Sequence, residues 1–263
     1  MSKQAKKPKK ELTIEQKINR RNFISFASFT VLAGGAYGGW RWLYKSPEEA
    51  AGGVTGSAHK PLRKALNKTE LFFRRVFSDN HLVKTYPKEM AVKGARVNSD
   101  IGIEAKKKFD PATWKLNVVK KGGEVLQVSL QEIMALPKTE IVYDFKCVEG
   151  WDEIQHWAGV KFIDFIKHFK LDEYTKMEYV GMETPDKAYY VGIDMPSAIH
   201  PQTLLAYEMS DKPLQLQHGA PLRLIIPVKY GIKNLKRIGT ITFSNTRPRD
   251  YWAEEGYDYY SGL

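Results

Sequence analysis

The sequence predicts an α+β fold in which mixed β-sheets are flanked by peripheral helices. Short β-branched and aromatic segments alternate with brief amphipathic segments, but without the regular strand–helix–strand rhythm of a doubly wound sheet. The clearest strand spans Ile141 to Phe145 and ends just before Cys147. The clearest helix lies at 162–169, where phenylalanine and isoleucine recur with helical spacing. With 263 residues, 43% of them hydrophobic, the chain can bury a substantial core.

The N-terminus begins with a basic leader, residues 1–22. It carries eight lysines and arginines against two glutamates, and so holds six of the chain's eleven net positive charges. The rest of the chain is only modestly basic, which disfavours a nucleic-acid-binding body. Arg20 and Arg21 precede an uncharged run, so the leader resembles a twin-arginine export signal. An ordinary signal anchor is the alternative, and both interpretations place the body outside the cytoplasm.

The apolar segment 23–44 is either a signal or a membrane anchor. Its uncharged run is near the lower limit of spanning length, and two overlapping Gly-x-x-x-Gly spacings would let a second membrane helix approach closely. No clear cleavage site follows, so we expect a retained anchor. Residues 45–60 are rich in Pro, Gly, Ala and Ser and are expected to form a flexible linker. Residues 61–263 are expected to form the folded domain.

Within this domain, short surface helices are expected first and β-structure after Thr113. A hairpin is predicted around the Lys-Gly-Gly turn at 121–123, and Ser129 with Glu132 has the spacing of a capping box for the next helix. Later strands are expected at 178–182, 188–193, 222–228 and 236–243.

Cys147 is the only cysteine, so it cannot form an intrachain disulfide. Three interpretations are open: a buried core thiol, a redox nucleophile or a metal ligand. A nucleophile would need a nearby base or a resolving cysteine, and the sequence has no second cysteine. A single thiolate suits a soft metal whose other ligands come from a cofactor, but that interpretation requires a separate site for the cofactor's anionic group.

A candidate anion site lies in the basic segment 217–237. Arg223 could hold a phosphate with two nitrogens, while Lys233 and Lys236 add positive charge near Gly231, where the backbone can approach a ligand. A solvated basic loop is the simpler alternative. The sequence has no Gly-x-Gly-x-x-Gly fingerprint for nicotinamide and no histidine cluster with zinc-like spacing.

Several short motifs occur in the order that is typical of the sulfite-oxidase-type molybdopterin-dependent oxidoreductases. The chain resembles this family over about residues 95–263, and most of all its periplasmic branch of methionine-sulfoxide reductase catalytic subunits. The matching motifs are Cys147-Val-Glu-Gly-Trp151, Trp157-x-Gly159, Glu183-Thr184, Met195-Pro196, His200-Pro201, His218-Gly-Ala-Pro-Leu-Arg223 and Pro227-x-Lys-Tyr-Gly231-x-Lys233.

The resemblance implies the molybdopterin-binding fold and a molybdenum–molybdopterin cofactor whose metal is bound by Cys147. It implies pterin contacts at Thr184, Arg223 and 234–236, with His218 in place of the asparagine of the sulfoxide-reductase branch. That replacement leaves the identity with a sulfoxide reductase open, because histidine is larger and titratable. With Lys233 from the basic segment, the candidate cofactor-binding residues are Asn98, Thr184, His218, Arg223, Lys233, Asn234 and Lys236.

Other residues have simple structural explanations. We expect His156 in a surface turn near the thiol and the aromatic tail at 251–260 packed against the domain. Arg96 could face an anionic substrate or lie on the surface.

The sequence therefore predicts an exported, membrane-tethered molybdenum oxidoreductase of the periplasm that transfers an oxygen atom to or from a small substrate, a sulfoxide or sulfite. Because the chain lacks haem or iron–sulfur ligand spacing, electrons must be exchanged with a separate protein, for which we expect a membrane haem subunit. The alternative is a non-catalytic, membrane-tethered binding module that retains the fold. Such a module could have lost the thiol or the basic residues, and this chain has both.

Overall fold

The computed structural model describes residues 12–46, 81–103 and 109–263, together with 59, 61–62, 64–65, 68–69 and 72. The chain divides into two compact units, one that contains the N-terminal helix and one that contains the body after Leu66. Most of the predicted linker 45–60 and the first half of the basic leader lie outside the described residues.

The N-terminal unit is built on one long helix, α1 (Ile14–Lys45). Thr13 and Gln16 form a reciprocal capping box at its start, which satisfies two of the free amide groups of the first turn. The helix begins within the basic leader, so both arginines of the twin pair are helical, and none of its residues is buried. Across the described residues, no helix combines the length and the apolar character that crossing a membrane requires.

The body contains two β-sheets, whose order is β2-β1-β10-β5-β6 in one and β3-β4-β7-β8 with β9 paired to β7 in the other. The strands are β1 (Leu116–Val119), β2 (Val125–Val128), β3 (Lys138–Lys146), β4 (Asp152–Lys161), β5 (Tyr179–Glu183), β6 (Tyr190–Asp194), β7 (Leu204–Met209), β8 (Lys212–Pro213), β9 (Arg223–Ile225) and β10 (Thr240–Ser244). The β1–β10 pair is parallel and the other pairs are antiparallel, so the predicted α+β fold with mixed sheets is confirmed.

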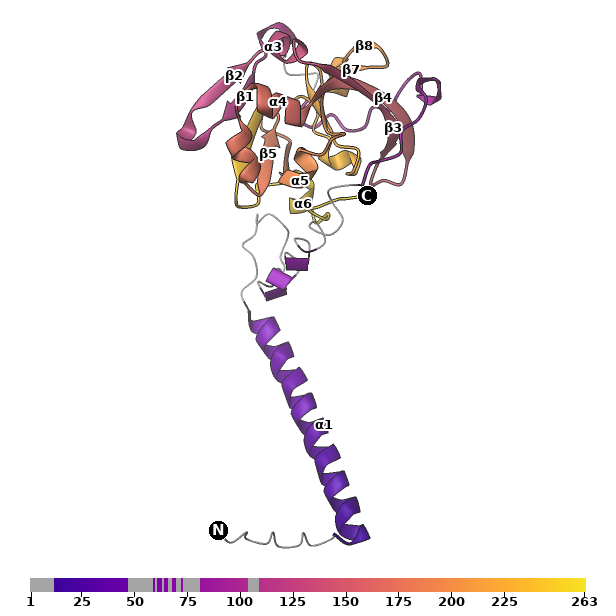
Figure 1. The fold of residues 1–263 in the computed structure, drawn as a ribbon, viewed down its shortest axis with the longest axis vertical. Coiled ribbons are helices and arrows are strands. Elements are labelled where there is room, and N and C mark those ends of the chain that lie inside the picture. Colours follow the sequence, from indigo (N-terminus) through magenta and orange to yellow (C-terminus); the bar gives the residue numbers. More distant parts are fainter. Residues whose placement is uncertain are drawn as a thin grey trace, which may run out of the picture. The chain divides into compact units, whose positions relative to one another are not determined.

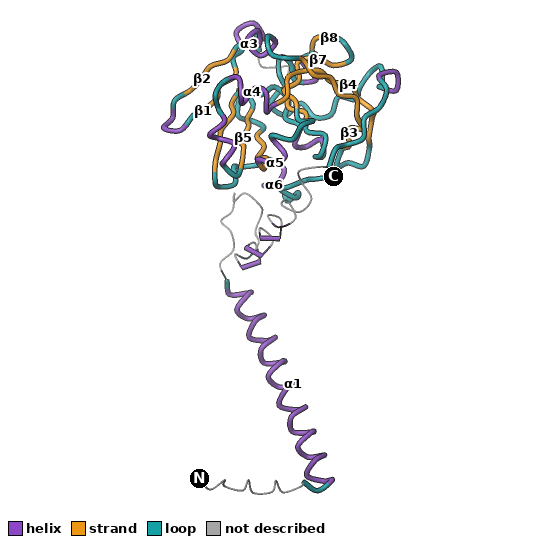
Figure 2. The backbone as a smooth tube through the Cα atoms, viewed as in Figure 1, coloured by secondary structure: helices purple, strands orange, loops and turns teal. Residues whose placement is uncertain are grey.

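The helices of the body are short (Figure 1). They are α3 (Leu130–Met134), α4 (Phe162–His168), α5 (Met195–Ala198) and α6 (Tyr251–Glu254). As predicted, Ser129 and Glu132 form a capping box at α3, and the apolar face of α4 is buried. Loops make up much of the rest and connect the sheets (Figure 2).

The main hydrophobic core joins both sheets. It combines β1, β5, β6 and β10 with α4 and the inner side chains of β7 and β9, including Phe162, Phe165 and Leu205, which are fully buried. A second cluster covers the other face of the β3–β4 sheet and includes Phe145 and Trp157. The site described below lies on the side of this second cluster.

The long β3–β4 hairpin corrects one prediction. His156 was expected in a surface turn, but β4 begins at Asp152 and pairs with β3 from there to Val160. His156 therefore lies opposite Val142 within the sheet and is 1% exposed. The turn is limited to the residues between Lys146 and Asp152, and Cys147 opens it.

Candidate active site

A cavity of about 330 Å³ opens in the body. Its lining comes from loop 96–101, the turn at 147–151, strand β4, segment 218–236, and Trp252 and Tyr257 of the C-terminal segment. These parts are far apart in sequence, and the two sheets bring them together. The cavity contains both halves of the site that the sequence suggested, the thiol and the basic segment.

Cys147 lines this cavity from the end of β3. The turn fixes its position, because its amide donates to the Trp151 carbonyl at 2.9 Å and Gly150 adopts a φ of 87° that favours glycine. The thiol is 5% exposed, and the Asn98 side-chain amide donates to the sulfur at 3.5 Å. Burial raises the pKa of the Cys147 thiol, while the Asn98 amide and nearby backbone amides oppose that rise.

Arg223 of β9 is a buried cation beside the cavity. Its guanidinium donates to the His218 carbonyl at 3.0 Å and to the Asn234 carbonyl at 3.2 Å, and it lies over the Trp157 ring at 4.5 Å. Burial lowers its pKa to about 10. Within the described part of the chain, no carboxylate forms an ion pair with it.

Lys236 is a second cation without a carboxylate partner among the described residues. Its ammonium donates to the carbonyls of Asn98 at 2.5 Å and Ser99 at 2.8 Å. Burial, and secondly the charge of Arg223, lower the pKa of Lys236 to about 7. Burial lowers the pKa of His218 to about 4, and the positive charges of Arg223 and Lys236 contribute to this shift. His218 is therefore neutral at physiological pH.

Residues of the cavity lining also carry polar atoms that have no hydrogen-bond partner among the described residues. Arg223 Nε, Trp157 Nε1 and Gln155 Oε1 are buried and lack a hydrogen bond. Buried polar groups are normally satisfied, so unpartnered atoms at one wall indicate that a polar ligand completes the site. Together with two unpaired cations, they fit a large anionic group that has hydrogen-bonding edges.

The side chains of three predicted cofactor-binding residues form contacts within the protein. Thr184 does not line the cavity: its hydroxyl donates to Asp186 at 2.7 Å, and its methyl group packs against Gly102. Lys233 is fully buried away from the lining and pairs with Asp250. Asn234 lines the cavity, but its side chain accepts from the Ile226 amide at 2.7 Å and donates to the Tyr230 carbonyl at 3.1 Å.

The structure adds lining residues to which the sequence analysis gave no role in the site. Tyr189, Trp252 and Tyr257 contribute rings to the cavity, and Gln155 and Trp157 contribute polar atoms from β4. The aromatic tail was expected only to pack against the domain, yet two of its side chains reach the site. Arg96 also lines the cavity and holds its guanidinium 5.0 Å from the centre of the Trp151 ring.

A second polar group lies outside the cavity. Glu140, His156 and Asp211 bring three possible metal ligands within 4.8 Å of one another, although their sequence spacing gave no such signal. The Lys88 ammonium pairs with Asp211 and lies 3.7 Å from Glu140. The positive charge of this lysine therefore already compensates the two carboxylates.

A family model described as the oxidoreductase molybdopterin binding domain matches residues 103–252. The chain belongs to this family. The match includes Cys147, Arg223 and Lys236, and it confirms the resemblance that the motifs indicated. The described cavity fits the family's cofactor: one thiol could bind the metal, and the two unpaired cations and the unpartnered polar atoms could receive the pterin and its phosphate.

Similar proteins agree with this assignment. A chain from Azospira oryzae, provisionally named protein-methionine-sulfoxide reductase subunit YedZ1, is 34% identical over 187 residues, 71% of this chain and 70% of that one. The protein-methionine-sulfoxide reductase catalytic subunit MsrP of Campylobacter jejuni is 31% identical, with 59% of this chain and 58% of that one covered. MsrP of Xanthomonas axonopodis is 36% identical, with 56% and 52% covered. This chain thus spans between 52% and 70% of these relatives.

Among solved structures, the chain is similar to the sulfane dehydrogenase SoxCD from Paracoccus pantotrophus. The TM-score is 0.46 at 14% sequence identity, over 54% of this chain and 40% of that one.

Proposed function

We propose that this chain is a molybdenum–molybdopterin oxidoreductase that reduces sulfoxides, with methionine sulfoxide as the substrate class. The observation that carries the proposal is that one fixed, buried thiol lines the same cavity as the buried Arg223 and the half-buried Lys236, and neither cation has a carboxylate partner among the described residues. The names of the relatives support sulfoxide over sulfite.

In this proposal each residue of the cavity has a separate role in binding the cofactor. Cys147 supplies the thiolate ligand, and Asn98 donates to its sulfur and fixes its direction. Arg223 and Lys236 neutralise the anionic part of the cofactor, and the Trp157 indole N–H is free to donate to its polar edge. When bound, the molybdenum centre would supply the two-electron chemistry that oxygen-atom transfer requires.

The role of His218 follows from its protonation state. Since it stays neutral, it can donate one hydrogen bond without adding a third charge beside Arg223 and Lys236. It can therefore replace an asparagine as a neutral donor, and the histidine is compatible with a sulfoxide reductase.

Reduction of one sulfoxide consumes two electrons and two protons and releases the sulfide and water. The sequence offers one cysteine and no haem-binding pattern, so a separate protein must deliver the electrons. A membrane haem protein is the partner that we propose. The helix α1, with its arginine pair, would direct the folded protein out through the twin-arginine route to the periplasmic side of the inner membrane.

Metal analysis and turnover test the proposal together. The purified protein should hold about one molybdenum per chain and reduce methionine sulfoxide with a reduced dye as electron donor, because a single thiolate ligand is present. Cys147→Ser should lose the molybdenum and the activity.

A native protein free of molybdenum would contradict the proposal and favour the non-catalytic binding module. Oxidation of sulfite with no reduction of methionine sulfoxide would overturn the substrate class alone.

A further inference from the structure

The C-terminal segment supplies an aromatic wall to the cavity. Trp252 of α6 and Tyr257 both line it, and their rings meet edge to face with centroids 5.2 Å apart. The Tyr257 amide donates back to the Trp252 carbonyl at 2.9 Å, which ties the two residues together. Tyr257 is 44% exposed and thus lies at the opening. The match to the family model ends at residue 252, so Tyr257 lies beyond it.

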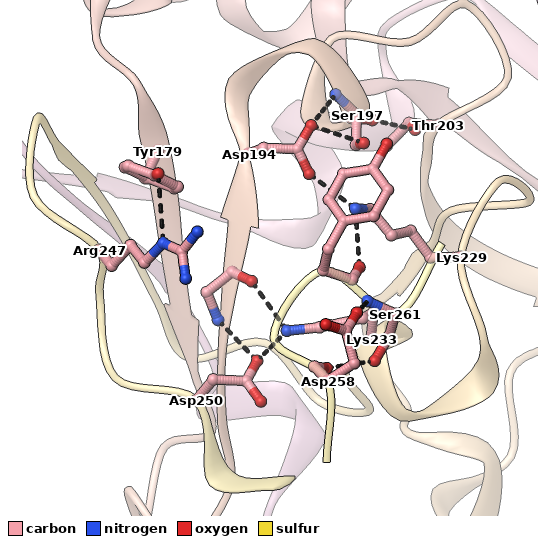
Figure 3. Close-up of polar contacts among 12 residues, drawn as sticks. Tyr179, Asp194, Ser197, Thr203, Lys229, Lys233, Arg247, Asp250, Asp258 and Ser261 are labelled. Carbon is pink, nitrogen blue, oxygen red and sulfur yellow. Dashed lines mark hydrogen bonds and ion pairs between the residues drawn. The ribbon is translucent and has the colours of Figure 1, made fainter. Parts of the chain in front are cut away.

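This wall rests on a rigid support. Asp250 caps α6 by accepting from the Ala253 amide at 3.0 Å, and its other oxygen accepts from the Gly192 amide at 3.0 Å and pairs with Lys233 (Figure 3). Tyr251 packs against the Tyr189 ring with centroids 5.4 Å apart. A side chain fixed by such a support can select a ligand by shape, because it loses little conformational freedom on binding.

The same helix is tied at its other end. Glu254 accepts from the Tyr190 hydroxyl at 2.6 Å and from Arg249 at 2.7 Å. Tyr190 begins β6, which also contains Gly192, so both ends of α6 are hydrogen-bonded to strand β6.

The turn after Cys147 supplies a third aromatic ring. Trp151 stacks on Phe145 with centroids 6.1 Å apart, and its indole donates to Glu149 at 3.0 Å. Arg96 lies over the same ring. The charged side chains of this part of the lining, Arg96 and Glu149, have opposite signs. Apart from Arg223 and Lys236, which the proposed function assigns to the cofactor, Arg96 and Glu149 are the charged residues of the lining, and several of the other lining residues are aromatic.

We propose that Trp252 and Tyr257 are specificity-determining residues that, with Trp151, hold the apolar substituent on the sulfur of the substrate. The inference rests on the proposed sulfoxide reduction, and it names the residues that contact the substituent on the substrate sulfur. Aromatic faces and edges favour a thioether sulfur and apolar groups, and an aromatic wall does not compensate a free anionic charge.

The test compares a small and a large substituent on the cofactor-loaded full chain. Trp252→Ala should raise the KM for methyl phenyl sulfoxide by about tenfold, which corresponds to about 1.4 kcal/mol and lies within the range of an aromatic pair. The KM for dimethyl sulfoxide should change by less than about twofold, and kcat should be unchanged for both. Tyr257→Ala should show a smaller effect in the same direction, and Trp252→Phe should retain most of the affinity.

A binding measurement separates this inference from the proposed reaction. Calorimetry with the product methyl phenyl sulfide should show binding to the wild-type protein and about tenfold weaker binding to Trp252→Ala. Tyr86→Ala, which removes an aromatic ring outside the cavity, is the matched control and should bind normally.

If the cofactor-loaded protein reduces no sulfoxide, the proposed reaction is wrong. The calorimetry still tests whether the aromatic wall binds the apolar substituent. The proposed role of the aromatic wall would be overturned if Trp252→Ala raised the KM equally for both sulfoxides. It would also be overturned if the wild type and Trp252→Ala bound methyl phenyl sulfide equally, or if the wild type did not bind it.

Discussion

Two kinds of cation stand within one short segment of this chain, and they have different surroundings. Lys229 and Lys233 are buried with carboxylates of the protein: Lys229 lies 2.7 Å from Asp194, and Lys233 pairs with Asp250 (Figure 3). Among the described residues, Arg223 and Lys236 donate hydrogen bonds only to backbone carbonyls and form no ion pair with a carboxylate. All four are basic residues of the same motif-bearing stretch.

The difference separates cations that are paired within the fold from the two cations that we propose to bind an anionic ligand. A buried charge is stable when a partner of opposite sign is present, and the cost of removing it from water is otherwise uncompensated. Asp194 and Asp250 compensate the first pair within the fold. The second pair has its pKa values lowered to about 10 for Arg223 and about 7 for Lys236, because burial penalises their charged forms. An anion from outside would relieve that cost.

The largest expected effect concerns the paired lysine. Lys233→Met leaves the Asp250 carboxylate buried without its cation, and we expect the free energy of unfolding to fall by roughly 3–5 kcal/mol. Chemical denaturation measures it. The double variant Lys233→Met with Asp250→Asn should recover part of the loss, because no charge is then left unpaired. Equal losses in the single and double variants would show that the ion pair is not what stabilises this region.

A smaller effect is expected from pH. Lys236 is protonated below about pH 7 and loses its charge above it, so an anion should bind the cofactor-free chain more weakly as pH rises. Sulfate, whose own charge is constant in this range, should lose about tenfold in affinity between about pH 6 and about pH 8.5. Titration calorimetry at both values measures this, and Lys236→Met should bind weakly at both. A pH-independent affinity in the wild type would remove Lys236 from the anion site.

The sequence was sufficient to predict the parts of the site that lie in contiguous motifs. Cys147 and the basic segment around Arg223 could be found because a lone thiol and a cluster of cations are unusual in themselves. The α+β class followed from the interspersed strands. Strand β4 was not predicted. Its first residues, Asp152 and Glu153, follow a glycine turn, and pairing with β3 outweighs their low strand propensity.

What could not be predicted depends on contacts between distant residues. Lys233 and Lys236 are three positions apart and look alike in sequence, and only the position of Asp250, which β6 and α6 set through Gly192, distinguishes their roles. Trp252 belongs to the site for the same reason, since the supports of α6 come from residues some 60 positions earlier, such as Gly192 and Tyr190.

The most direct test of the central claim, that the unpaired cations hold the cofactor, is the molybdopterin content of Lys236→Met. We predict that pterin and molybdenum per chain fall to about a tenth of the wild-type value or less, since hydrogen bonds to a charged group contribute roughly 1.5–3 kcal/mol each. The unfolding free energy of the cofactor-free chain should change by less than about 1 kcal/mol, because Asn98 and Ser99 are not buried and their carbonyls can be hydrated. Full molybdopterin content in a normally folded Lys236→Met protein would contradict the account.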